Sequence, residues 1–524
     1  MVAAENDALP NAKVGGIGDV VRDIPLALQQ AGCHVQVVLP DYGYLAKLPS
    51  TQKIGQFQVR FGGKLEEVHL FKVRPKHTML DQASAGNQPI QYWALGHSYF
   101  SPCGDGAVYC NDGSDRPFAT DASKYAFFCA AVAQVAVEGG FGELDVVHLH
   151  DWHTALILVL RQFAPEFQAL KAIPMVYTIH NLSLQGVRPF TGDDSSFESW
   201  FPELIYDRAA ICDPRAKHCI NPMRAGVVLA NKIHAVSPTY ALEIQRPSQA
   251  ELGLYGGEGL EQDLVEAANE NKLVGILNGC EYPTAQKYKI SNKTELANII
   301  LESLIGWVSQ KPNVASCHWV AQKRVSQWLQ NKERGFLVTS VGRITGQKVR
   351  LLKEVVNPET GDTLLDALLT MLGRQGEIFL LGSGTTDYEQ YLLEVSSRHR
   401  NFIYLQGYSD ALSHAMYNNG DLFLMPSSFE PCGISQMLAM RAGQPCLVHA
   451  TGGLNDTVVD GVTGFSFGGG DTQSQAHNCI AKFAEVLEMH NNNPAQFQKI
   501  ARAAQAQRFS WDTVAQDYIS KLYS

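Results

Sequence analysis

The segment VVHLHDWH, residues 146–153, places His148, His150, Asp151 and His153 within six positions. Imidazole and carboxylate groups are common ligands of zinc and other transition metals, so this density allows a metal site. In an extended strand, side chains two positions apart share a face, which puts His148 and His150 on one side. The alternatives at this stage are a metal site and a strand end with functional polar residues.

A glycine-rich segment, KVGGIGDV at residues 13–20, follows the first apolar run. We expect a turn from a strand into a helix that starts near Asp19, where backbone N–H groups can approach a phosphate and Lys13 adds positive charge. An ordinary turn is an equally good interpretation of these residues alone. The segment is not G-x-G-x-x-G, which speaks against a nicotinamide or flavin cofactor.

Two cations, Arg343 and Lys348, follow another apolar run in SVGRITGQK. At a strand end they can clamp a diphosphate and stabilise a departing nucleoside diphosphate. Taken alone, an arginine and a lysine are more often solvated surface cations.

Two later strand ends carry further polar residues and glycines. Glu430 in LMPSSFEPCGISQMLAMRAG comes directly after a buried run and before a predicted helix start, so it is either a helix cap or a carboxylate positioned for sugar hydroxyls or a developing positive charge. The backbone N–H groups that can bind an anion at these two helix starts belong to Gly433, Ile434, Ser435, Thr451, Gly452 and Gly453.

The apolar runs that precede these residues are short and rich in Val, Ile and Leu, and they alternate with helix-like stretches. This pattern is typical of parallel strands buried on both faces, so the fold class is α/β with doubly wound domains. Between residues 59 and 100 the pattern instead predicts antiparallel strands around Gly62-Gly63. In such folds ligands bind outside the carboxyl ends of the strands, so we expect the site in a cleft between two domains.

The composition limits the possible partners. The 524 residues are 45% hydrophobic and 18% charged, with a formal net charge of -10, which does not favour nucleic acid as a partner. No apolar run is long enough for a membrane span and no signal peptide is recognisable, so we expect a cytoplasmic protein. The 11 cysteines are scattered and never spaced C-x-x-C, which predicts buried thiols rather than a disulfide framework or a zinc ribbon.

Taken together, the motifs resemble those of the bacterial glycogen synthase and plant starch synthase family. The resemblance rests on KVGGIGDV, VHLHDWHTAL, YTIHNLSLQG, VSPTYALEI, GILNG, GRITGQK, SSFEPCGISQMLAMRAG and TGGLNDTV, in the order and spacing of the family. It covers residues 1–280 and 336–524.

The resemblance implies a GT-B glycosyltransferase, in which two Rossmann-like domains face each other across a cleft. We expect an N-terminal domain over residues 1–280, a linker region over 281–335, a nucleotide-sugar domain over 336–475 and bracing helices over 476–524. The implied reaction is retaining transfer of glucose from ADP-glucose to the non-reducing end of an α-1,4-glucan such as glycogen. The family needs no metal or other cofactor, and Asp-x-Asp, the metal-carrying signature of the other large glycosyltransferase fold, is absent from the sequence.

The resemblance also assigns roles. His180 faces the reacting sugar, Glu430 lies by the glucose C3 and C4 hydroxyls, and Arg343 and Lys348 neutralise the leaving diphosphate. These four are the predicted catalytic residues. The predicted substrate-binding residues are Lys13, Gly15, Gly16, Asp19, Asp151, Asn181, Asn278, Tyr408 (on the adenine), Cys432, Gly433, Ile434, Ser435, Thr451, Gly452 and Gly453. No metal site is expected, and His148 is expected in the core.

The sequence departs from the family at several points. The first strand is short, the stretch after Gly279 is altered, Val349 replaces a glycine beside Lys348, and Ser428 stands where an arginine is usual. Two alternatives therefore remain: a GT-B enzyme with another donor or acceptor, such as a sucrose or trehalose-type transferase, and a non-catalytic glucan-binding relative. The choice between ADP-glucose and UDP-glucose, and the oligomeric state, are open at this stage.

Overall fold

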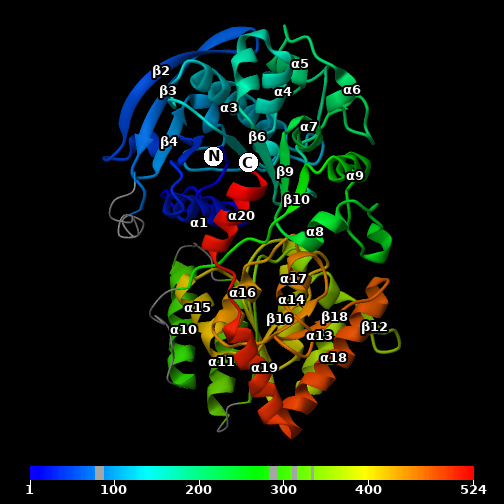
Figure 1. The fold of residues 1–524 in the computed structure, drawn as a ribbon. Helices are drawn as coiled ribbons and strands as arrows, with labels where there is room; N and C mark the ends of the chain where they lie inside the picture. Colours follow the sequence, from blue (N-terminus) through cyan, green and yellow to red (C-terminus); the bar gives the residue numbers. More distant parts are fainter. Residues whose placement is uncertain (77–87, 283–291, 310–314, 332–334) are drawn as a thin grey trace. The chain divides into compact units, whose positions relative to one another are not determined.

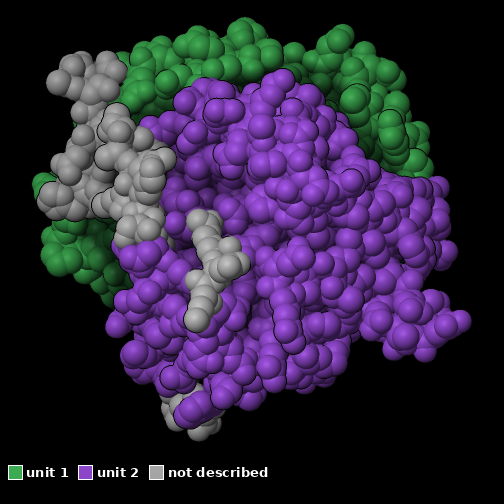
Figure 2. Space-filling view, turned by 90° about the horizontal axis from the view of Figure 1, so that it is seen from below, with its two compact units in different colours: residues 1–248, 256–279, 510–524 green, residues 249–255, 280–509 purple. Residues whose placement is uncertain are grey.

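The computed structural model describes residues 1–76, 88–282, 292–309, 315–331 and 335–524. The chain forms two compact units. Unit 1 comprises Met1–Ser248, Gly256–Gly279 and Ser510–Ser524, and unit 2 comprises Gln249–Tyr255 and Cys280–Phe509. Figure 2 colours the two units separately.

Unit 1 contains a parallel sheet in the order β10-β9-β6-β5 and a mixed sheet in the order β1-β4-β3-β2. Val2 forms one parallel bridge with Val38 and another with Leu149, and so connects the two sheets. The strands are β1 (Gln36–Pro40), β2 (Gln52–Phe61), β3 (Lys64–Val73), β4 (Gln91–Gly96), β5 (Val147–His150), β6 (Met175–Ile179), β9 (Lys232–Ala235) and β10 (Leu273–Gly275), with a short pair β7 (Arg188–Pro189) and β8 (Cys219–Ile220).

The antiparallel pair predicted around Gly62-Gly63 is confirmed. β2 and β3 pair antiparallel from Gln52–Lys72 to Phe61–Lys64, and Gly62 and Gly63 form the turn with φ values of 57° and 73°. Two successive positive φ values are the geometry of a tight hairpin turn and favour glycine at both positions.

The helices of unit 1 cover its sheets (Figure 1). They are α1 (Gly16–Gln30), α3 (Ala119–Val137), α4 (Leu156–Phe163), α5 (Phe197–Trp200), α6 (Arg208–Ile211), α7 (Pro222–Leu229), α8 (Pro238–Glu243), α9 (Glu261–Asn269) and α20 (Trp511–Lys521). The C-terminal helix α20 packs its Trp511 and Tyr518 into one apolar cluster with Ile24 and Leu28 of α1. The last 15 residues of the chain therefore belong to unit 1.

Unit 2 contains a six-stranded sheet in the order β15-β14-β11-β16-β17-β18, in which every neighbouring pair is parallel. The strands are β11 (Phe336–Val341), β14 (Gly376–Leu381), β15 (Phe402–Leu405), β16 (Leu422–Met425), β17 (Cys446–His449) and β18 (Phe465–Phe467). A short antiparallel pair, β12 (Val355–Asn357) and β13 (Asp362–Thr363), lies outside this sheet.

Successive strand residues of unit 2 enter two different apolar cores. Ile378 and Leu380 of β14 belong to the core that contains α13 (Leu364–Leu372) and α18 (Thr472–Asn492). Phe379 and Leu381 belong to the core that contains α10 (Lys293–Ser309), α11 (Ser316–Gln330) and α15 (Asp410–Asn419). This alternation explains the continuous apolar runs in the sequence, because both faces of the sheet are covered by helices (Figure 1).

The helices of unit 2 are α10 (Lys293–Ser309), α11 (Ser316–Gln330), α12 (Gly346–Val349), α13 (Leu364–Leu372), α14 (Thr386–Arg398), α15 (Asp410–Asn419), α16 (Ser435–Arg441), α17 (Gly452–Thr457), α18 (Thr472–Asn492) and α19 (Pro494–Ala506). Within the predicted linker region, residues 281–335, α10 and α11 contribute Leu296, Ile300 and Val325 to a core of unit 2. Among the helices of the described residues, none is long and apolar enough to cross a membrane.

Candidate functional site

In unit 2, the loops that follow β11, β14, β16 and β17 are bound to one another at the carboxyl ends of the strands. After β11 and β14, the N–H of Ile344 donates to the Ser383 carbonyl at 3.0 Å, and the N–H of Thr385 donates to the Ile344 carbonyl at 2.7 Å. The approach is so close that a Cβ on Gly382 would lie 1.9 Å from the Gly342 carbonyl oxygen. Gly382 and Gly384, where a Cβ would lie 2.2 Å from the Ile344 carbonyl oxygen, are therefore needed to bring the two strand ends together.

The loop after β11 is joined to the loop after β16 by three contacts. The N–H of Ser428 donates to the Gln347 carbonyl at 2.8 Å, and the Gln347 side-chain amide donates to the Phe429 carbonyl at 3.0 Å. Beside them, the Lys348 ammonium forms an ion pair with the Glu430 carboxylate, which is 7% exposed. The structure thus brings together two of the predicted catalytic residues, Lys348 and Glu430.

The loop after β17 completes the cluster. The N–H of Gly453 donates to the Glu430 carbonyl at 3.0 Å. A Cβ on Gly452 would lie 1.9 Å from the Glu430 carbonyl oxygen, and a Cβ on Gly453 would lie 2.1 Å from that of Cys432. Gly452 also has a φ of 44°. Both glycines are therefore required by the backbone contact that places Glu430, in addition to any role toward an anion.

Some of the N–H groups predicted to bind an anion donate within the protein instead. That of Gly453 is bonded to Glu430 as described, and that of Thr451 donates to the His449 carbonyl at 2.9 Å. Ile434 and Ser435 stand at the start of α16, directly after Gly433 with its φ of 76°.

Gln436 is a residue that sequence reasoning missed. Its side chain is fully buried and donates to the Gly433 carbonyl at 2.9 Å and to the Cys432 carbonyl at 3.2 Å. It therefore fixes the turn between Glu430 and α16. The only signal in the sequence is a polar residue one position after Ser435, on the inward face of a helix.

Arg343 and Tyr408 lie at the surface of unit 2, after β11 and β15 respectively. Tyr408 is 62% exposed, and its hydroxyl donates to the Asp410 carboxylate at 2.5 Å. Val349, which replaces the usual glycine beside Lys348, is buried in the core next to Leu351 and Leu352. Its β-branched side chain is accommodated there, while Lys348 still reaches Glu430.

In unit 1, the glycine-rich segment is held by Glu5, a second residue that sequence reasoning missed. The Glu5 carboxylate accepts the N–H groups of Val14 at 2.7 Å and Gly15 at 2.5 Å. Its other oxygen accepts the hydroxyl of Tyr109 at 2.7 Å. In this structure a carboxylate thus occupies the donors that we expected to face a phosphate, and α1 begins at Gly16, three residues before Asp19.

Lys13 and Asp19 are paired with each other rather than separate. The Lys13 ammonium contacts the Asp19 carboxylate at 2.6 Å and the Asp7 carboxylate at 3.6 Å. Burial opposes the charge on Lys13, but the two carboxylates outweigh it, so the pKa of Lys13 is raised. Arg22 also contacts Asp7 at 2.6 Å and Asp19 at 3.2 Å, so the start of α1 is a network of paired charges.

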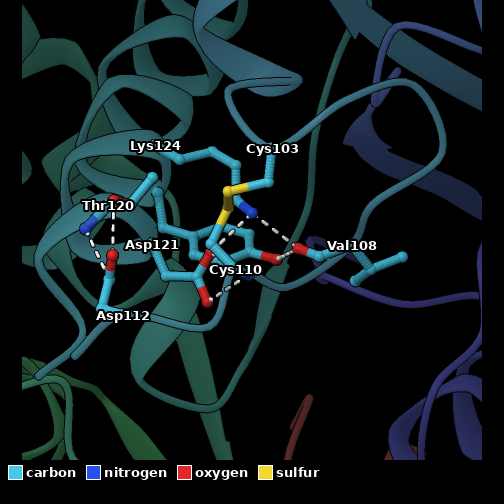
Figure 3. The surroundings of a disulfide bond; sticks show 8 residues. Cys103, Val108, Cys110, Asp112, Thr120, Asp121 and Lys124 are labelled. Carbon is cyan, nitrogen blue, oxygen red and sulfur yellow. Dashed lines mark hydrogen bonds and ion pairs between the residues drawn. A yellow bond between two sulfur atoms is a disulfide. The ribbon is translucent and has the colours of Figure 1, made fainter. Parts of the chain in front are cut away.

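The loop that carries Tyr109 is closed by a disulfide between Cys103 and Cys110 (Figure 3). This single local bridge, between cysteines seven positions apart, is not a disulfide framework, and the spacing of the cysteines in the sequence did not predict it. The other nine cysteines are free thiols, six of them buried, as expected.

The same loop is anchored by residues of α3 (Figure 3). The buried Lys124 ammonium donates to the Val108 carbonyl and to Asp121, each at 2.6 Å, and Asp121 accepts the N–H of Cys110 at 3.1 Å. Burial lowers the pKa of Lys124 and raises that of Asp121, and their mutual attraction opposes both shifts. Tyr109 is therefore held by hydrogen bonds on both sides, independently of the disulfide.

Among the described residues, which include VVHLHDWH, there is no cluster of three or more His, Cys, Asp or Glu side chains that could hold a metal ion. His148 and His150 stack on one face of β5 with ring centroids 4.7 Å apart. His148 is buried, as expected, between the Tyr523 hydroxyl at 2.7 Å and the Thr178 hydroxyl at 2.5 Å. Burial holds the pKa of both histidines well below the usual value, so both rings are neutral.

Three predicted residues of unit 1 meet at the ends of β5 and β6. The His180 Nε2 lies 2.9 Å from the His150 Nδ1, and the His180 N–H donates to the Asp151 carboxylate at 2.7 Å. Burial lowers the pKa of His180 to about 3 and raises the pKa of Asp151 to about 7. Asp151 also has a φ of 55°, an uncommon conformation for a non-glycine residue, and such strain is concentrated at functional sites.

The side-chain oxygens of Asn278 and Asn181 differ in their hydrogen bonding. The Asn278 side chain is 4% exposed, and its Oδ1 is buried with no hydrogen-bond partner. A buried acceptor without a donor costs free energy, so this oxygen fits a ligand hydroxyl. The Asn181 Oδ1 instead accepts the N–H of Ser183 at 3.0 Å and forms a local turn.

Comparisons with known proteins agree with this architecture. Residues 1–266 match the family model described as the starch synthase catalytic domain, and residues 322–503 match the one described as glycosyl transferases group 1. A glycogen synthase of Desulfitobacterium hafniense is 29% identical over 529 residues, covering 98% of this chain and 97% of the relative. A glycogen synthase of Gloeobacter violaceus is 32% identical over 461 residues, covering 87% and 83%.

Solved structures extend the comparison. The catalytic domain of starch synthase IV from Arabidopsis thaliana, bound to ADP and acarbose, has a TM-score of 0.70 at 25% identity and covers 100% of this chain and 97% of that one. A sucrose-phosphate synthase from Thermosynechococcus elongatus has a TM-score of 0.53 at 14% identity, which supports the fold alone, and the match covers 100% of this chain and 97% of that one.

Two parallel-sheet units with charged and glycine-rich loops at the strand ends define a GT-B glycosyltransferase. The chain belongs to the starch and glycogen synthase family, whose function is the transfer of glucose from ADP-glucose to an α-1,4-glucan. The predicted fold class and family are thereby confirmed.

We predict that Gly452→Ala impairs the site, whereas Gly461→Ala does not. Both glycines have positive φ values, 44° and 68°, but only at Gly452 would a Cβ collide with the Glu430 carbonyl, because nothing lies within 4 Å of a Cβ at Gly461. We expect Gly452→Ala to lower transferase turnover by at least about tenfold. Equal turnover in the two variants would show that the contact with Glu430 is unimportant.

Asp151→Asn should alter the pH dependence of stability. Since the pKa of Asp151 is about 7 in the folded chain against 3.8 in the reference state, this group stabilises the fold at low pH. That contribution, on the order of 4 kcal/mol, is lost as the pH rises from about 4 to about 7. The free energy of unfolding of the wild type relative to Asp151→Asn, measured with urea from pH 4 to 8, should fall over that range and then level off. A constant difference would contradict the shift.

Loss of the disulfide should matter less than loss of Lys124. We expect Cys103→Ser to cost at most about 2–3 kcal/mol, because the closed loop is short and Val108 and Cys110 stay bonded to α3. Lys124→Met leaves the buried Asp121 carboxylate unpaired, which costs about 3–5 kcal/mol. Thermal denaturation of the two variants checks this order, and a larger loss in Cys103→Ser would reverse our assignment of what holds the loop.

Proposed function

We propose that this chain uses ADP-glucose as donor and extends the non-reducing end of an α-1,4-glucan with retention of configuration. The observation that carries the proposal is the ion pair of Lys348 with the buried Glu430 within the connected loops of unit 2. The relative from Arabidopsis thaliana that matches over the whole chain was solved with ADP and acarbose bound, which supports an adenosine diphosphate donor and a glucan-like acceptor.

In this proposal unit 2 receives the donor diphosphate. Lys348 and Arg343 neutralise the charge that develops on the diphosphate as the glucose C1–oxygen bond breaks. An anionic phosphate competes with Glu430 for the Lys348 ammonium, so donor binding draws the lysine away from the carboxylate. Glu430 is then available to hydrogen-bond glucose hydroxyls and to balance positive charge on the sugar ring.

Residues of unit 1 bind the donor glucose and the acceptor. His180 is neutral because its pKa is about 3, and its Nε2 is engaged with His150, so its Nδ1 is the atom that can bond a glucose hydroxyl. The Asn278 Oδ1, buried without a partner, accepts a second hydroxyl. Asp151 fixes the backbone of His180 and so positions its ring. The acceptor hydroxyl bonds to C1, and its proton leaves with the diphosphate.

The test is transfer of labelled glucose from ADP-glucose, and in parallel from UDP-glucose, to glycogen by the purified chain. We expect incorporation from ADP-glucose, with Glu430→Gln and Lys348→Met each lowering turnover by about 10²-fold to 10³-fold because each removes a charge placed at the reacting centre. Lys353→Met, a lysine in the next turn of the chain, serves as a matched control and should retain activity.

Three outcomes separate the alternatives. Preference for UDP-glucose would correct the donor while keeping the reaction class. No transfer from either donor by a folded protein would overturn the proposal in favour of a glucan-binding relative. If Glu430→Gln were as active as the control Lys353→Met, Glu430 would have no role in the reaction.

A further inference from the structure

The turn that carries Tyr408 is covered by a tryptophan of α10. The indole of Trp307 lies against Gly407 so closely that a Cβ there would be 2.5 Å from its Cδ2 and Cε2 atoms. Its Nε1–H donates to the carbonyl oxygen of Tyr408 at 2.8 Å. A single side chain thus packs on one residue of the turn and bonds the backbone of the next.

The neighbouring residues of the turn are held from the same side. The His318 Nε2–H of α11 donates to the Gln406 carbonyl at 3.2 Å, and the Ser303 hydroxyl of α10 donates to that of Ser409 at 3.3 Å. The four consecutive residues 406–409 are therefore each contacted by a side chain of α10 or α11. Both helices are anchored in turn, because they share an apolar core with β15, which ends at Leu405.

The side chains that hold the turn come from a part of the chain that neither family model covers. The matches end at residue 266 and resume at residue 322, whereas Ser303, Trp307 and His318 lie between them. The same region is where the sequence departs from the family pattern after Gly279. The three side chains that hold the turn therefore lie outside the two segments that the family models match.

The turn stands at a place where a ligand is expected. The turn follows the carboxyl end of β15, in the parallel sheet whose strand-end loops carry Lys348 and Glu430. Within β15, the Tyr404 hydroxyl donates to the Gly382 carbonyl of the neighbouring loop at 3.3 Å. Tyr408 is 62% exposed, whereas the backbone that carries it is fixed. A fixed, exposed aromatic ring is suited to stack on a flat ligand group with little loss of conformational entropy.

We propose that Trp307 is a positioning residue that holds Tyr408 ready to stack on the nucleobase of the sugar-nucleotide donor. The proposal rests on the proposed function, in which unit 2 binds that donor. In this role Trp307 affects the affinity for ligands that contain a nucleobase but not the affinity for a diphosphate alone. A general structural role would affect both affinities.

Binding of ADP and of inorganic pyrophosphate, each measured by calorimetry, tests this distinction. We expect Trp307→Ala to raise the Kd for ADP about tenfold, within the range known for base stacking on aromatic residues, and to leave the Kd for pyrophosphate within twofold. The KM for the donor should rise equally, with kcat and the KM for glycogen unchanged. Trp307→Phe keeps a ring over Gly407 but loses the hydrogen bond, so its effect should be intermediate.

The matched control is Trp319→Ala, since Trp319 is a tryptophan of α11 that is 65% exposed. It should leave both dissociation constants unchanged. In a double-mutant cycle, Tyr408→Ala and Trp307→Ala should be strongly non-additive, because the second change removes support from a ring that is already absent.

Equal weakening of ADP and pyrophosphate binding, or full additivity with Tyr408→Ala, would overturn the positioning role. If Trp307→Ala does not fold, Trp307→Phe applies the same criteria. A wild-type chain that binds pyrophosphate but not ADP, or binds neither, would instead contradict the proposed function itself, so the two failures are distinguishable.

Discussion

The Glu430 carboxylate sets the constraint on which unit 2 is built. A charged group that is 7% exposed must be compensated, and the Lys348 ammonium does this directly. For the two charges to meet, the loops after β11 and β16 must lie in backbone contact, which the bonds between Gln347 and residues 428–429 provide. The Glu430 carbonyl in turn admits only glycine at position 452. The position of Glu430, through its side chain and its backbone carbonyl, therefore constrains residues in the loops after β11 and β17.

A related balance operates in unit 1, with carboxylates as the organising groups. Glu5 collects two N–H groups of the glycine-rich segment and the Tyr109 hydroxyl, and Asp151 fixes the backbone of His180. The surrounding histidines are neutral because burial disfavours their charged forms. The histidines at the ends of β5 and β6 therefore offer neutral hydrogen-bonding groups, which in the proposed function bond sugar hydroxyls.

In the proposed function, the two strand-end clusters bind different parts of the sugar nucleotide, and their chemistry differs accordingly. Unit 2 offers cations and close-packed glycine loops, the features that accommodate a diphosphate, and it places an exposed tyrosine beyond them. Unit 1 offers neutral histidine rings and the side-chain oxygen of Asn278, which is buried without a hydrogen-bond partner, and such groups can bond sugar hydroxyls. Trp307 of α10 and His318 of α11 support the turn that carries this tyrosine.

The sequence by itself determined the α/β class, the antiparallel pair at Gly62-Gly63, the family and the placement of Lys348, Glu430 and His180 after strands. These follow from local periodicity and from motifs of adjacent residues, which a single chain displays directly. Only the tertiary structure decided that Glu5 binds the glycine-rich segment, that Cys103 joins Cys110, that Gln436 fixes the Cys432 turn and that Trp307 covers Gly407. Trp307 and Gly407 lie far apart in the sequence, and the other three contacts, although more local, depend on the path of the backbone, so no periodicity encodes them.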